Sequence, residues 1–381
     1  MKALVMKRGE TGAYITDIPK PQLNQADQVL VRVIEAGLDG TDYNMIKHNL
    51  QDITDDKNEI VMGHEMVGVV EETGGSVTSV VPGDTVVLTV RRGCGICQPC
   101  LHNQSDMCMT GLFTERGIHK KDGYFTEFVV DQEQYVIKVP DGLFGLAVFT
   151  EPLSIAEKGI AQLRTIQSRF PWSCEHEEHD YLSPDWGGCK SALVLGAGPL
   201  GILATSLLRL AGVRTFVADI VGKDSPKAHL VKHMEADYID VNNRNPKEIV
   251  ELCCGSSGRL DIVFEASGAA ATAIELVNYM SRSSIYVMTG IPREEIIVSV
   301  DAAQLVRQMV RQNQVVVGSV NSNRTHFETA LKDIPVINSR FHGMLEEMIT
   351  HRYKLADGNR IFKGNEPGHI KSVIEIGARP G

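Results

Sequence analysis

The sequence predicts an α/β protein with two domains, a β-rich domain first and a doubly wound parallel-sheet domain after it. The chain has 381 residues, more than one ordinary hydrophobic core accommodates. Roughly its first 150 residues read as short strands separated by turn residues. Beyond them, short apolar strands alternate with helical patterns, which is typical of a parallel sheet covered on both faces.

The N-terminal strands are recognised by their alternation of apolar and polar residues. MKALVMK, QVLVRVI and EMVGVVEE each follow this pattern, and Gly, Pro, Asn and Asp separate them. We therefore expect a largely antiparallel domain. The tail after about residue 322 returns to mixed helix and strand, so we assign residues 1–158 and 320–381 to this first domain and residues 159–319 to the second.

The second domain begins with a strand and a helix in close succession. ALVLG reads as a buried strand and GPLGILATSLLRLAG as a helix, and RTFVADI, DIVFEAS, SSIYVMTGI and QVVVGSV supply further strands. The stretch SRFPWSCEHEEHDYLSPDWGGCK that precedes them is polar and rich in turn residues. It predicts a surface loop or linker.

Charge and composition exclude several classes of partner. A net charge of −10 argues against nucleic acid and anionic membranes, since both favour a basic face. No apolar run approaches 18 residues, and MKALVMKRGE lacks the apolar core of a signal peptide. We expect a cytoplasmic protein with reduced thiols.

The motif GAGPLG directly follows the strand ALVL and opens a helix, as a dinucleotide-binding loop requires. Gly196 would allow the tight turn, Gly198 the approach of a pyrophosphate, and Gly201 close packing of helix on strand. This pattern predicts a Rossmann domain. Further residues expected at the cofactor are Pro199, Leu200, Ser267, Gly268, Thr289 and Asn321.

Asp219 ends the next strand, where a carboxylate can bind the ribose hydroxyls of NAD and repel the extra phosphate of NADP. Only Lys223 is basic among the residues that follow, IVGKD. NAD is therefore the expected cofactor, with NADP possible.

Four of the eight cysteines are clustered as C-x2-C-x2-C-x7-C, at Cys94, Cys97, Cys100 and Cys108. In a reducing compartment such a cluster indicates a metal site before a disulfide framework. Four thiolates suit tetrahedral zinc with no open position, which is a structural site. An iron–sulfur cluster is the alternative use of four cysteines.

A second metal site is suggested by residue type at Asp39, His64, Glu65 and Glu151. Histidine with carboxylates can hold zinc and leave room for water or substrate. Glu151 opens the helical pattern EPLSIAEKGI at the junction of the two predicted domains. Spacing alone leaves the alternative open that His64 is an interior histidine and Asp39 a turn residue.

Three further groups carry weaker signals. Cys174, His176 and His179 could hold a metal, but a solvated acidic loop is the simpler interpretation. His229 and His233 share a helix face without the glutamate of a zinc-protease motif, so a surface helix is expected. Cys253 and Cys254 are expected to be buried or incidental.

GHE, the four-cysteine lobe, EPLS and GAGPLG occur in the order found in zinc-dependent medium-chain dehydrogenases/reductases, and the chain resembles that family over nearly its whole length. VRRGCGICQPC, ERGIHKKDGY and GSVNSNRTHF resemble its glucose 1-dehydrogenase branch. The resemblance implies a GroES-like catalytic domain, a Rossmann cofactor domain, two zinc ions per chain and a homo-dimer or homo-tetramer. It also implies oxidation of an aldose, glucose first, at its anomeric carbon to the lactone.

The resemblance also assigns roles to single residues. The family usually has cysteine at the position of Asp39, and a subset of glucose dehydrogenases is similar to this chain in carrying aspartate. It implies that Asp39 and His64 bind the catalytic zinc, completed by Glu65 or Glu151. Thr41 resembles the hydroxyl that begins a proton relay. Glu115 and Asn321, with Thr41 and Glu151, correspond to sugar-binding positions.

Two positions keep alternatives open. By the same resemblance, Val90 and Ile155 stand where some sugar-oxidising relatives have polar residues. A zinc-dependent polyol or alcohol dehydrogenase is therefore the nearest alternative. A nucleotide-binding zinc protein without catalysis is the alternative of another class, and it would be favoured if Asp39 bound no metal.

Overall fold

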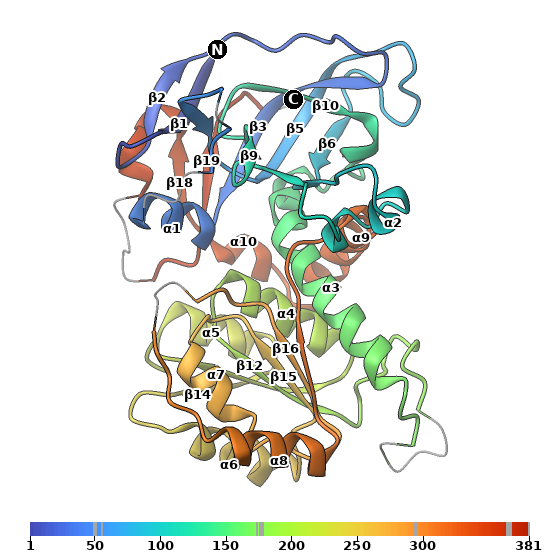
Figure 1. Ribbon diagram of the computed structural model, residues 1–381, viewed down its shortest axis with the longest axis vertical. Coiled ribbons are helices and arrows are strands. Elements are labelled where there is room, and N and C mark those ends of the chain that lie inside the picture. The colour runs from blue at the N-terminus through green and yellow to red at the C-terminus, as the bar shows by residue number, and fades with distance from the viewer. Residues whose placement is uncertain are drawn as a thin grey trace. The chain divides into compact units, whose positions relative to one another are not determined.

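The computed structural model divides into two compact units. Unit 1 comprises Met1–Ser154, Asn321–Val336 and Leu345–Gly381, and unit 2 comprises Ile155–Val320 and Ile337–Met344. Each is described separately below (Figure 1). The structure describes residues 1–48, 52–54, 56–172, 174, 179–292, 296–362 and 368–379. Within these residues, no helix is both long and apolar enough to cross a membrane.

Unit 1 is built mainly of antiparallel strands. Its largest sheet has the order β11-β6-β5-β3-β19-β18, with β10 also paired to β3, and smaller sheets have the orders β2-β1-β4 and β7-β8-β9. Among the described strand pairs of unit 1, only β18 with β19 and β8 with β9 run parallel. The strands are β1 (Lys2–Lys7), β2 (Tyr14–Asp17), β3 (Gln28–Leu38), β4 (Glu59–Val61), β5 (Glu65–Thr73), β6 (Thr85–Leu88), β7 (Arg91–Arg92), β8 (Thr114–Arg116), β9 (Lys120–Lys121), β10 (Phe128–Gln132), β11 (Val136–Lys138), β18 (Ile349–Lys354) and β19 (Lys371–Glu375).

Short helices connect these strands. They are α1 (Gly40–His48), α2 (Gln98–Leu101) and α10 (Met344–Met348), and the longer α3 (Thr150–Gln167) and α9 (Arg324–Arg340) each run from one unit into the other. The 3-10 turns are η1 (Ser105–Met107), η2 (Glu133–Tyr135), η3 (Phe144–Phe149) and η4 (Leu355–Phe362).

The central strand β3 is buried along nearly its whole length because β5, β10 and β19 all pair with it. Val29, Val31 and Val33 join one apolar cluster, whereas Ala36 and Leu38 join another. The pairing of β3 with β5 shifts register between Val33 and Glu35. Like a bulge, that irregularity changes the alternation of side chains between the two faces of β3. Odd-numbered residues face one cluster before it, and even-numbered residues face the other cluster after it.

A buried ion pair crosses β3 near its end. Lys371, the first residue of β19, lies 2.5 Å from the carboxylate of Glu65, the first residue of β5, and both side chains are 0% exposed. Gly37 of β3 pairs with Glu65. A Cβ atom at Gly37 would lie 1.7 Å from a carboxylate oxygen of Glu65, so the pair depends on the missing side chain there.

The described part of unit 2 holds a six-stranded parallel sheet of order β14-β13-β12-β15-β16-β17. This is the doubly wound order of a dinucleotide-binding domain. Its strands are β12 (Ser191–Leu195), β13 (Arg214–Asp219), β14 (Asp237–Asp240), β15 (Ile262–Glu265), β16 (Ile285–Met288) and β17 (Val315–Gly318). Its helices are α4 (Pro199–Leu210), α5 (Pro226–His233), α6 (Pro246–Ser257), α7 (Ala270–Leu276) and α8 (Ala302–Gln312).

Helices cover both faces of this sheet. Leu193 and Val263 pack with apolar residues of α6 and α7. On the alternate face, Gly159 of α3 lies so close to Phe264 that a Cβ would stand 2.7 Å from its ring. Burial on both faces explains why these strands are continuous apolar runs. The α/β fold class predicted from the sequence is confirmed.

The contact across Gly37 yields a test of the ion pair. Gly37→Ala should displace the Glu65 carboxylate from Lys371 and leave two buried charges unpaired, which costs about 3 kcal/mol. The urea concentration that half-unfolds unit 1 should fall accordingly. Gly75→Ala is the matched control, since a Cβ there meets nothing within 4 Å. Equal midpoints for the two variants would contradict the dependence on Gly37.

Candidate functional site

Asp39 caps α1 and also faces His64. One of its carboxylate oxygens, Oδ1, accepts hydrogen bonds from the backbone N–H groups of Thr41 (2.7 Å) and Asp42 (3.2 Å). This satisfies the free donors at the helix start. The other oxygen, Oδ2, lies 3.5 Å from Nε2 of His64 and accepts from the Thr41 hydroxyl at 3.2 Å. The LDGTD segment is therefore a capping turn whose second carboxylate oxygen points at a histidine.

His64 stands between two carboxylates. Its Nδ1 lies 3.9 Å from Asp42 Oδ1, and neither atom has a hydrogen-bond partner among the described residues. Burial alone would lower the pKa of His64, but Asp39 and Asp42 outweigh it and raise the pKa well above its usual value. A metal-bound histidine commonly has this arrangement, with one ring nitrogen toward the ion and the other toward a carboxylate.

The carboxylates near His64 are crowded. Burial raises the pKa of Asp42 to about 7, even though the charge of His64 opposes that shift. Burial likewise raises the pKa of Glu151 to about 8. The negative charges of Glu65 and Asp39 add to this shift, whereas the positive charge of His64 opposes it. Burial would also raise the pKa of Asp39, but the charge of His64 and its hydrogen bond lower it instead. Among the residues whose charges shift the pKa values of these carboxyl groups, only Lys371 and His64 are cationic.

These residues fit a divalent cation. One ligand atom each of Asp39, His64 and Glu65 lies within 4.8 Å of the other two. Oxygen and imidazole donors suit zinc and also other divalent ions, because no thiolate is present to select zinc. Glu151 lies outside this group of three, although the charges of all three act on its pKa.

The structure adds two residues that sequence reasoning missed. Asp42 could have been found three residues after Asp39, because the i,i+3 spacing is usual at a helix cap. Lys371 has no local signal. It reaches Glu65 only because β19 and β5 flank the same strand.

A second polar cluster surrounds Glu115. Its carboxylate accepts from Arg91 Nε and Nη2 at 2.9 and 2.8 Å, and from Asn321 Nδ2 at 2.6 Å. Arg91 and Glu115 are paired residues of β7 and β8, and Arg91 also lies over the ring of Phe113 at 3.9 Å. Two of the four residues expected to bind sugar, Glu115 and Asn321, are thus in direct contact with each other.

The segment that carries Asn321 is tied to unit 1 by its neighbours. Ser322 Oγ lies 2.6 Å from Ser154 Oγ, and Asn323 Nδ2 donates to Asp106 Oδ1 at 3.0 Å. Ser154, Ser322 and Asp106 are buried. Asn321 itself has φ 59°, a left-handed conformation that asparagine tolerates better than most residues. These contacts hold its amide toward Glu115.

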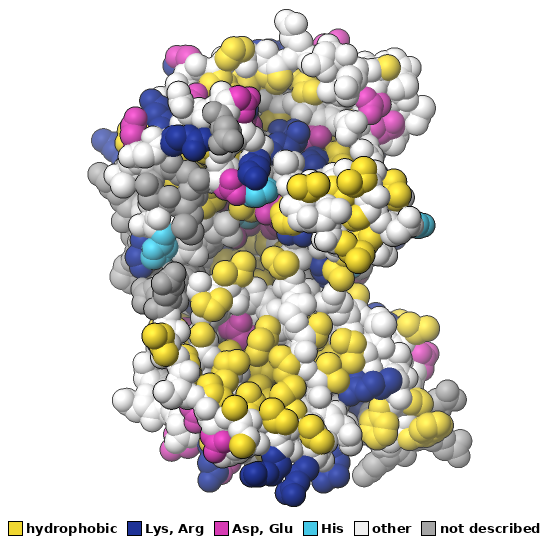
Figure 2. Space-filling view, in the orientation of Figure 1, with side chains coloured by type: hydrophobic (Ala, Val, Ile, Leu, Met, Phe, Trp, Pro, Cys, Tyr) yellow, Lys and Arg dark blue, Asp and Glu magenta, His cyan; other side chains and the backbone are white. Residues whose placement is uncertain are grey.

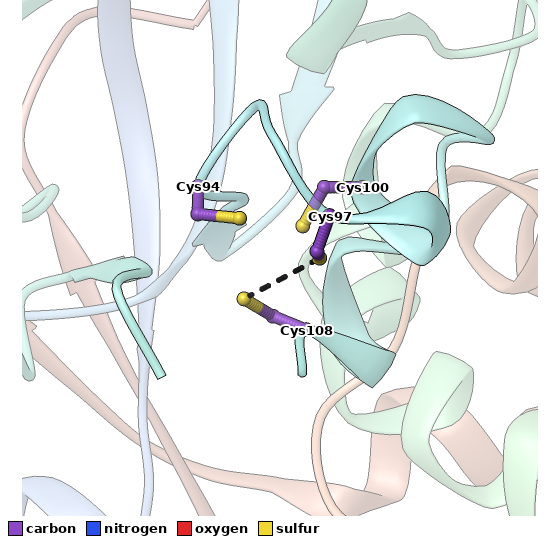
Figure 3. A group of neighbouring side chains, drawn as sticks. All are labelled: Cys94, Cys97, Cys100 and Cys108. Atoms are coloured by element: carbon purple, nitrogen blue, oxygen red, sulfur yellow. Dashed lines mark hydrogen bonds between the residues drawn. The ribbon is translucent and has the colours of Figure 1, made fainter. Parts of the chain in front are cut away.

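The four-cysteine lobe brings its thiols together. Figure 3 shows the sulfur atoms of Cys94, Cys97, Cys100 and Cys108 directed toward one another, and all four lie within 4.8 Å of each other. The Cys97 and Cys108 sulfurs are 4.0 Å apart, near the roughly 3.8 Å expected between sulfurs of a tetrahedral zinc site. Gly93 makes room for this packing, because a Cβ there would stand 2.6 Å from Cys100 Sγ.

The lobe has little apolar core of its own. Ile96, Met109 and Leu112 are 69%, 80% and 70% exposed, and Figure 2 shows hydrophobic side chains gathered on its surface. A hydrogen bond from Thr110 lowers the pKa of Cys94 to about 5, which favours a thiolate. Burial raises the pKa of Cys100 to about 12, so that thiol needs a cation to ionise. A zinc ion fits both requirements and would replace the missing core.

In unit 2 the glycine loop lies at the carboxyl end of β12. Gly196 has φ 94°, and a Cβ at Gly201 would lie 1.8 Å from the Gly196 carbonyl oxygen. Gly198 precedes α4 and has open space where a side chain would be. Pro199 and Leu200 form the first turn of α4. Asp219, at the end of the neighbouring β13, accepts a hydrogen bond from the backbone of Ala197 at 2.5 Å.

Ser267, Gly268 and Thr289 lie at the same edge of the sheet and are organised by Glu265. The buried Glu265 carboxylate accepts from the backbone N–H groups of Ser267 and Gly268, each at 2.7 Å. The Thr289 hydroxyl donates to the Glu265 carbonyl at 2.6 Å. The cofactor residues predicted in unit 2 therefore share one edge, where parallel-sheet proteins bind dinucleotides. Glu265 itself was missed because nothing in FEAS distinguishes a buried capping carboxylate.

The loop before β12 differs from its prediction. A solvated loop was expected, but His179 is 9% exposed and joins Cys174 and Cys189 in a group whose ligand atoms lie within 4.8 Å of one another. Sequence reasoning did not pair Cys189 with this group. His176 lies outside the described residues. His229 and His233 are exposed on α5, and Cys253 is buried in the core.

Comparisons with known proteins bear on the whole chain. The family model described as glucose dehydrogenase C-terminus matches residues 145–376, and the alcohol dehydrogenase GroES-like domain matches residues 25–141. Glucose 1-dehydrogenase of Methanocella arvoryzae is 34% identical over 99% of this chain and 100% of its own length. Haloferax mediterranei glucose dehydrogenase, solved in complex with NADP, Zn and gluconolactone, is 30% identical with a TM-score of 0.86 and covers 100% of both chains. Galactitol-1-phosphate dehydrogenase of Escherichia coli has the same fold at 20% identity, with a TM-score of 0.78 and coverage of 98% and 100%.

The two oxygens of Asp39 can be tested separately. Asp39→Asn should keep an oxygen for the cap of α1 but lose the charge that attracts a cation, whereas Asp39→Ala should lose both. Both variants should bind about one zinc fewer per chain, as measured by mass spectrometry of bound metal. Only Asp39→Ala should also lose about 1 kcal/mol of unfolding free energy from the missing cap. Full zinc content in Asp39→Asn would rule out the carboxylate as a ligand.

Proposed function

The chain belongs to the glucose dehydrogenase family of zinc-dependent medium-chain dehydrogenases, which makes it an NAD(P)-linked zinc dehydrogenase of the glucose 1-dehydrogenase type, and we propose that it oxidises glucose at the anomeric carbon to the lactone. The observation that carries this proposal is the contact of Glu115 with Asn321 at 2.6 Å. A sugar must replace the water bound to its hydroxyls, so its site needs a set of fixed polar partners. The relative solved with gluconolactone supports the same class of substrate.

We assign the catalytic metal to Asp39, His64 and one glutamate. Glu65 is held by Lys371 at 2.5 Å, and leaving that partner would break a buried ion pair. Glu151 has no such competing cation at hydrogen-bond distance among the described residues, and it lies in the first turn of α3. We therefore propose Asp39, His64 and Glu151 as ligands, with Glu65 behind them. The cysteines at 94, 97, 100 and 108 would hold a second, structural zinc.

The side chains can divide the reaction among them. When bound, zinc supplies a Lewis acid for the anomeric hydroxyl, and the nicotinamide supplies the hydride acceptor. The Thr41 hydroxyl donates to Asp39 Oδ2 at 3.2 Å, so its oxygen can accept a hydrogen bond from the anomeric hydroxyl. As it takes up that proton, it would release its own hydroxyl proton to water. Glu115 and Asn321 orient the sugar by its other hydroxyls. The products are lactone, reduced cofactor and one proton.

Asp219 supports a preference for NAD over NADP. Its carboxylate sits at the end of β13, beside the backbone of the glycine loop, where it would accept hydrogen bonds from ribose hydroxyls. A phosphate in that place would meet a negative charge. The relative from Haloferax mediterranei was solved with NADP, so the proposed preference for NAD is carried by Asp219 alone. A cytoplasmic location and assembly into a dimer or tetramer stay predictions of the sequence.

A substrate panel tests the proposed reaction. Initial rates of cofactor reduction should be measured on zinc-loaded protein with glucose, galactose, xylose, sorbitol and simple alcohols, each with NAD and with NADP. We expect turnover of an aldose, higher kcat/KM with NAD, loss of the rate on chelation and recovery with zinc. Turnover of sorbitol or alcohols alone would favour a polyol or alcohol dehydrogenase. An inactive protein that still binds zinc and NAD would favour the non-catalytic alternative.

The role of Glu115 has its own test. Glu115→Gln keeps the shape of the side chain but removes the charge that orders Arg91 and Asn321. KM for the sugar should rise roughly tenfold or more, as expected when a charged hydrogen-bond partner of a bound hydroxyl is lost, while KM for NAD changes little. Glu72→Gln, an exposed carboxylate of β5, is the control. Equal rises in both Michaelis constants would contradict sugar binding by Glu115.

A further inference from the structure

A cluster of two thiols and an imidazole lies in unit 2 and shares no residue with the two proposed zinc sites of unit 1. Cys174 Sγ is 3.2 Å and Cys189 Sγ is 3.5 Å from the same atom, Nδ1 of His179. The three ligand atoms lie within 4.8 Å of one another. Cys189 comes 15 residues after Cys174 and stands just before β12, so two ends of the loop between α3 and β12 meet at this point.

The distances are those of ligands around one ion. Zinc bonds of about 2.3 Å to sulfur and about 2.0 Å to nitrogen place tetrahedral S and N ligands roughly 3.6 Å apart. Hydrogen bonding explains the cluster less well. A neutral histidine offers one in-plane lone pair at one nitrogen, so two S–H groups cannot both donate well to Nδ1. A cation between the three atoms accommodates all of them.

Neighbouring aromatic and backbone groups hold the imidazole of His179 in place. The His179 ring lies against Tyr181 with centroids 4.2 Å apart, and its backbone N–H donates to the Pro171 carbonyl at 2.9 Å. Tyr181 and Trp186 are 3% and 4% exposed, and Arg164 of α3 donates to the Tyr181 carbonyl at 2.7 Å. These contacts bury His179, Tyr181 and Trp186 against one another and against α3, so this part of the stretch is packed.

The backbone that leads to Cys189 is held in place as well. The N–H of Gly187 donates to the Ala211 carbonyl at 2.9 Å, and a Cβ at Gly187 would lie 2.1 Å from Val213. The chain therefore runs closely against residues 211–213 before it enters β12. Neither Cys174 nor Cys189 forms a disulfide in the structure, and both sulfurs lie beside His179 Nδ1.

We propose that Cys174, His179 and Cys189 form a third zinc site, structural in role, that fastens the loop between α3 and β12 to the sheet of unit 2. Two thiolates and one imidazole are ligands that zinc prefers. These residues supply three positions, and the fourth is left to water or another donor. Zinc binding releases the thiol protons and closes a loop of about 15 residues, which stabilises the folded chain as a cross-link does.

Metal counting on the full chain tests the proposal. Wild type, Cys174→Ser and Cys189→Ser should be purified with zinc present, dialysed, and measured by mass spectrometry of bound metal. Cys254→Ser, which changes a partly buried cysteine outside every metal-ligand group, is the matched control. Each site variant should hold about one zinc fewer per chain than the control.

Two further readouts keep the result independent of folding and of activity. Cobalt-loaded wild type should show a sulfur-to-cobalt absorption band that weakens in both site variants, while circular dichroism stays unchanged. Melting temperatures of the site variants should fall by about 5 °C, and zinc added back after dialysis should raise those of the wild type and of Cys254→Ser by more than those of the site variants. Equal zinc content in all four proteins would overturn the proposal. So would a thiol count that reveals a Cys174–Cys189 disulfide in protein purified under reducing conditions.

Discussion

The ion pair between Glu65 and Lys371 is the constraint on which the candidate active site depends. Both side chains are fully buried, so each ion loses its hydration and the contact with the other compensates for that loss. The pair joins strands on either side of β3 and requires Gly37 between them. It therefore fixes where β5 begins, and His64 is the residue directly before that strand. The imidazole reaches Asp39 because the strand that directly follows His64 is anchored by Lys371.

The same region has more negative charge than its cations offset. Asp39, Asp42, Glu65 and Glu151 surround His64, and burial raises the pKa of Glu151 to about 8 and that of Asp42 to about 7. Such crowding is costly unless protons or a cation neutralise it. Asp39 serves both the fold and the proposed metal site, because one carboxylate oxygen caps α1 while the other is directed at His64. A cysteine in its place would offer a single sulfur, which could not serve both purposes in this way.

Sequence patterns were informative where a function is confined to neighbouring residues. The glycine loop and the four-cysteine lobe are each encoded within a short segment, so spacing alone indicated their chemistry. The fold class followed from alternating elements of ordinary length. Lys371 and Glu265 could not be found in this way, because their roles arise from strands that become neighbours only in the folded sheet. Cys189 was missed for a related reason: the turn from residue 180 to residue 188 returns the chain to His179.

The metal-ligand groups differ in how strongly each depends on the rest of the fold. The four-cysteine lobe exposes much of its apolar surface, so its shape depends on the ion more than on packing. The group at Asp39 is held by a sheet and a buried ion pair, and its oxygen ligands are hard and exchangeable. Cys174, His179 and Cys189 combine thiolate ligands with a packed aromatic surround. Zinc held by four thiolates with no open position should leave last on chelation, and an ion held by oxygen ligands at Asp39 should leave first, with the three-ligand group between them. The order in which the metals are lost would then separate a labile site for chemistry from sites that hold the chain together.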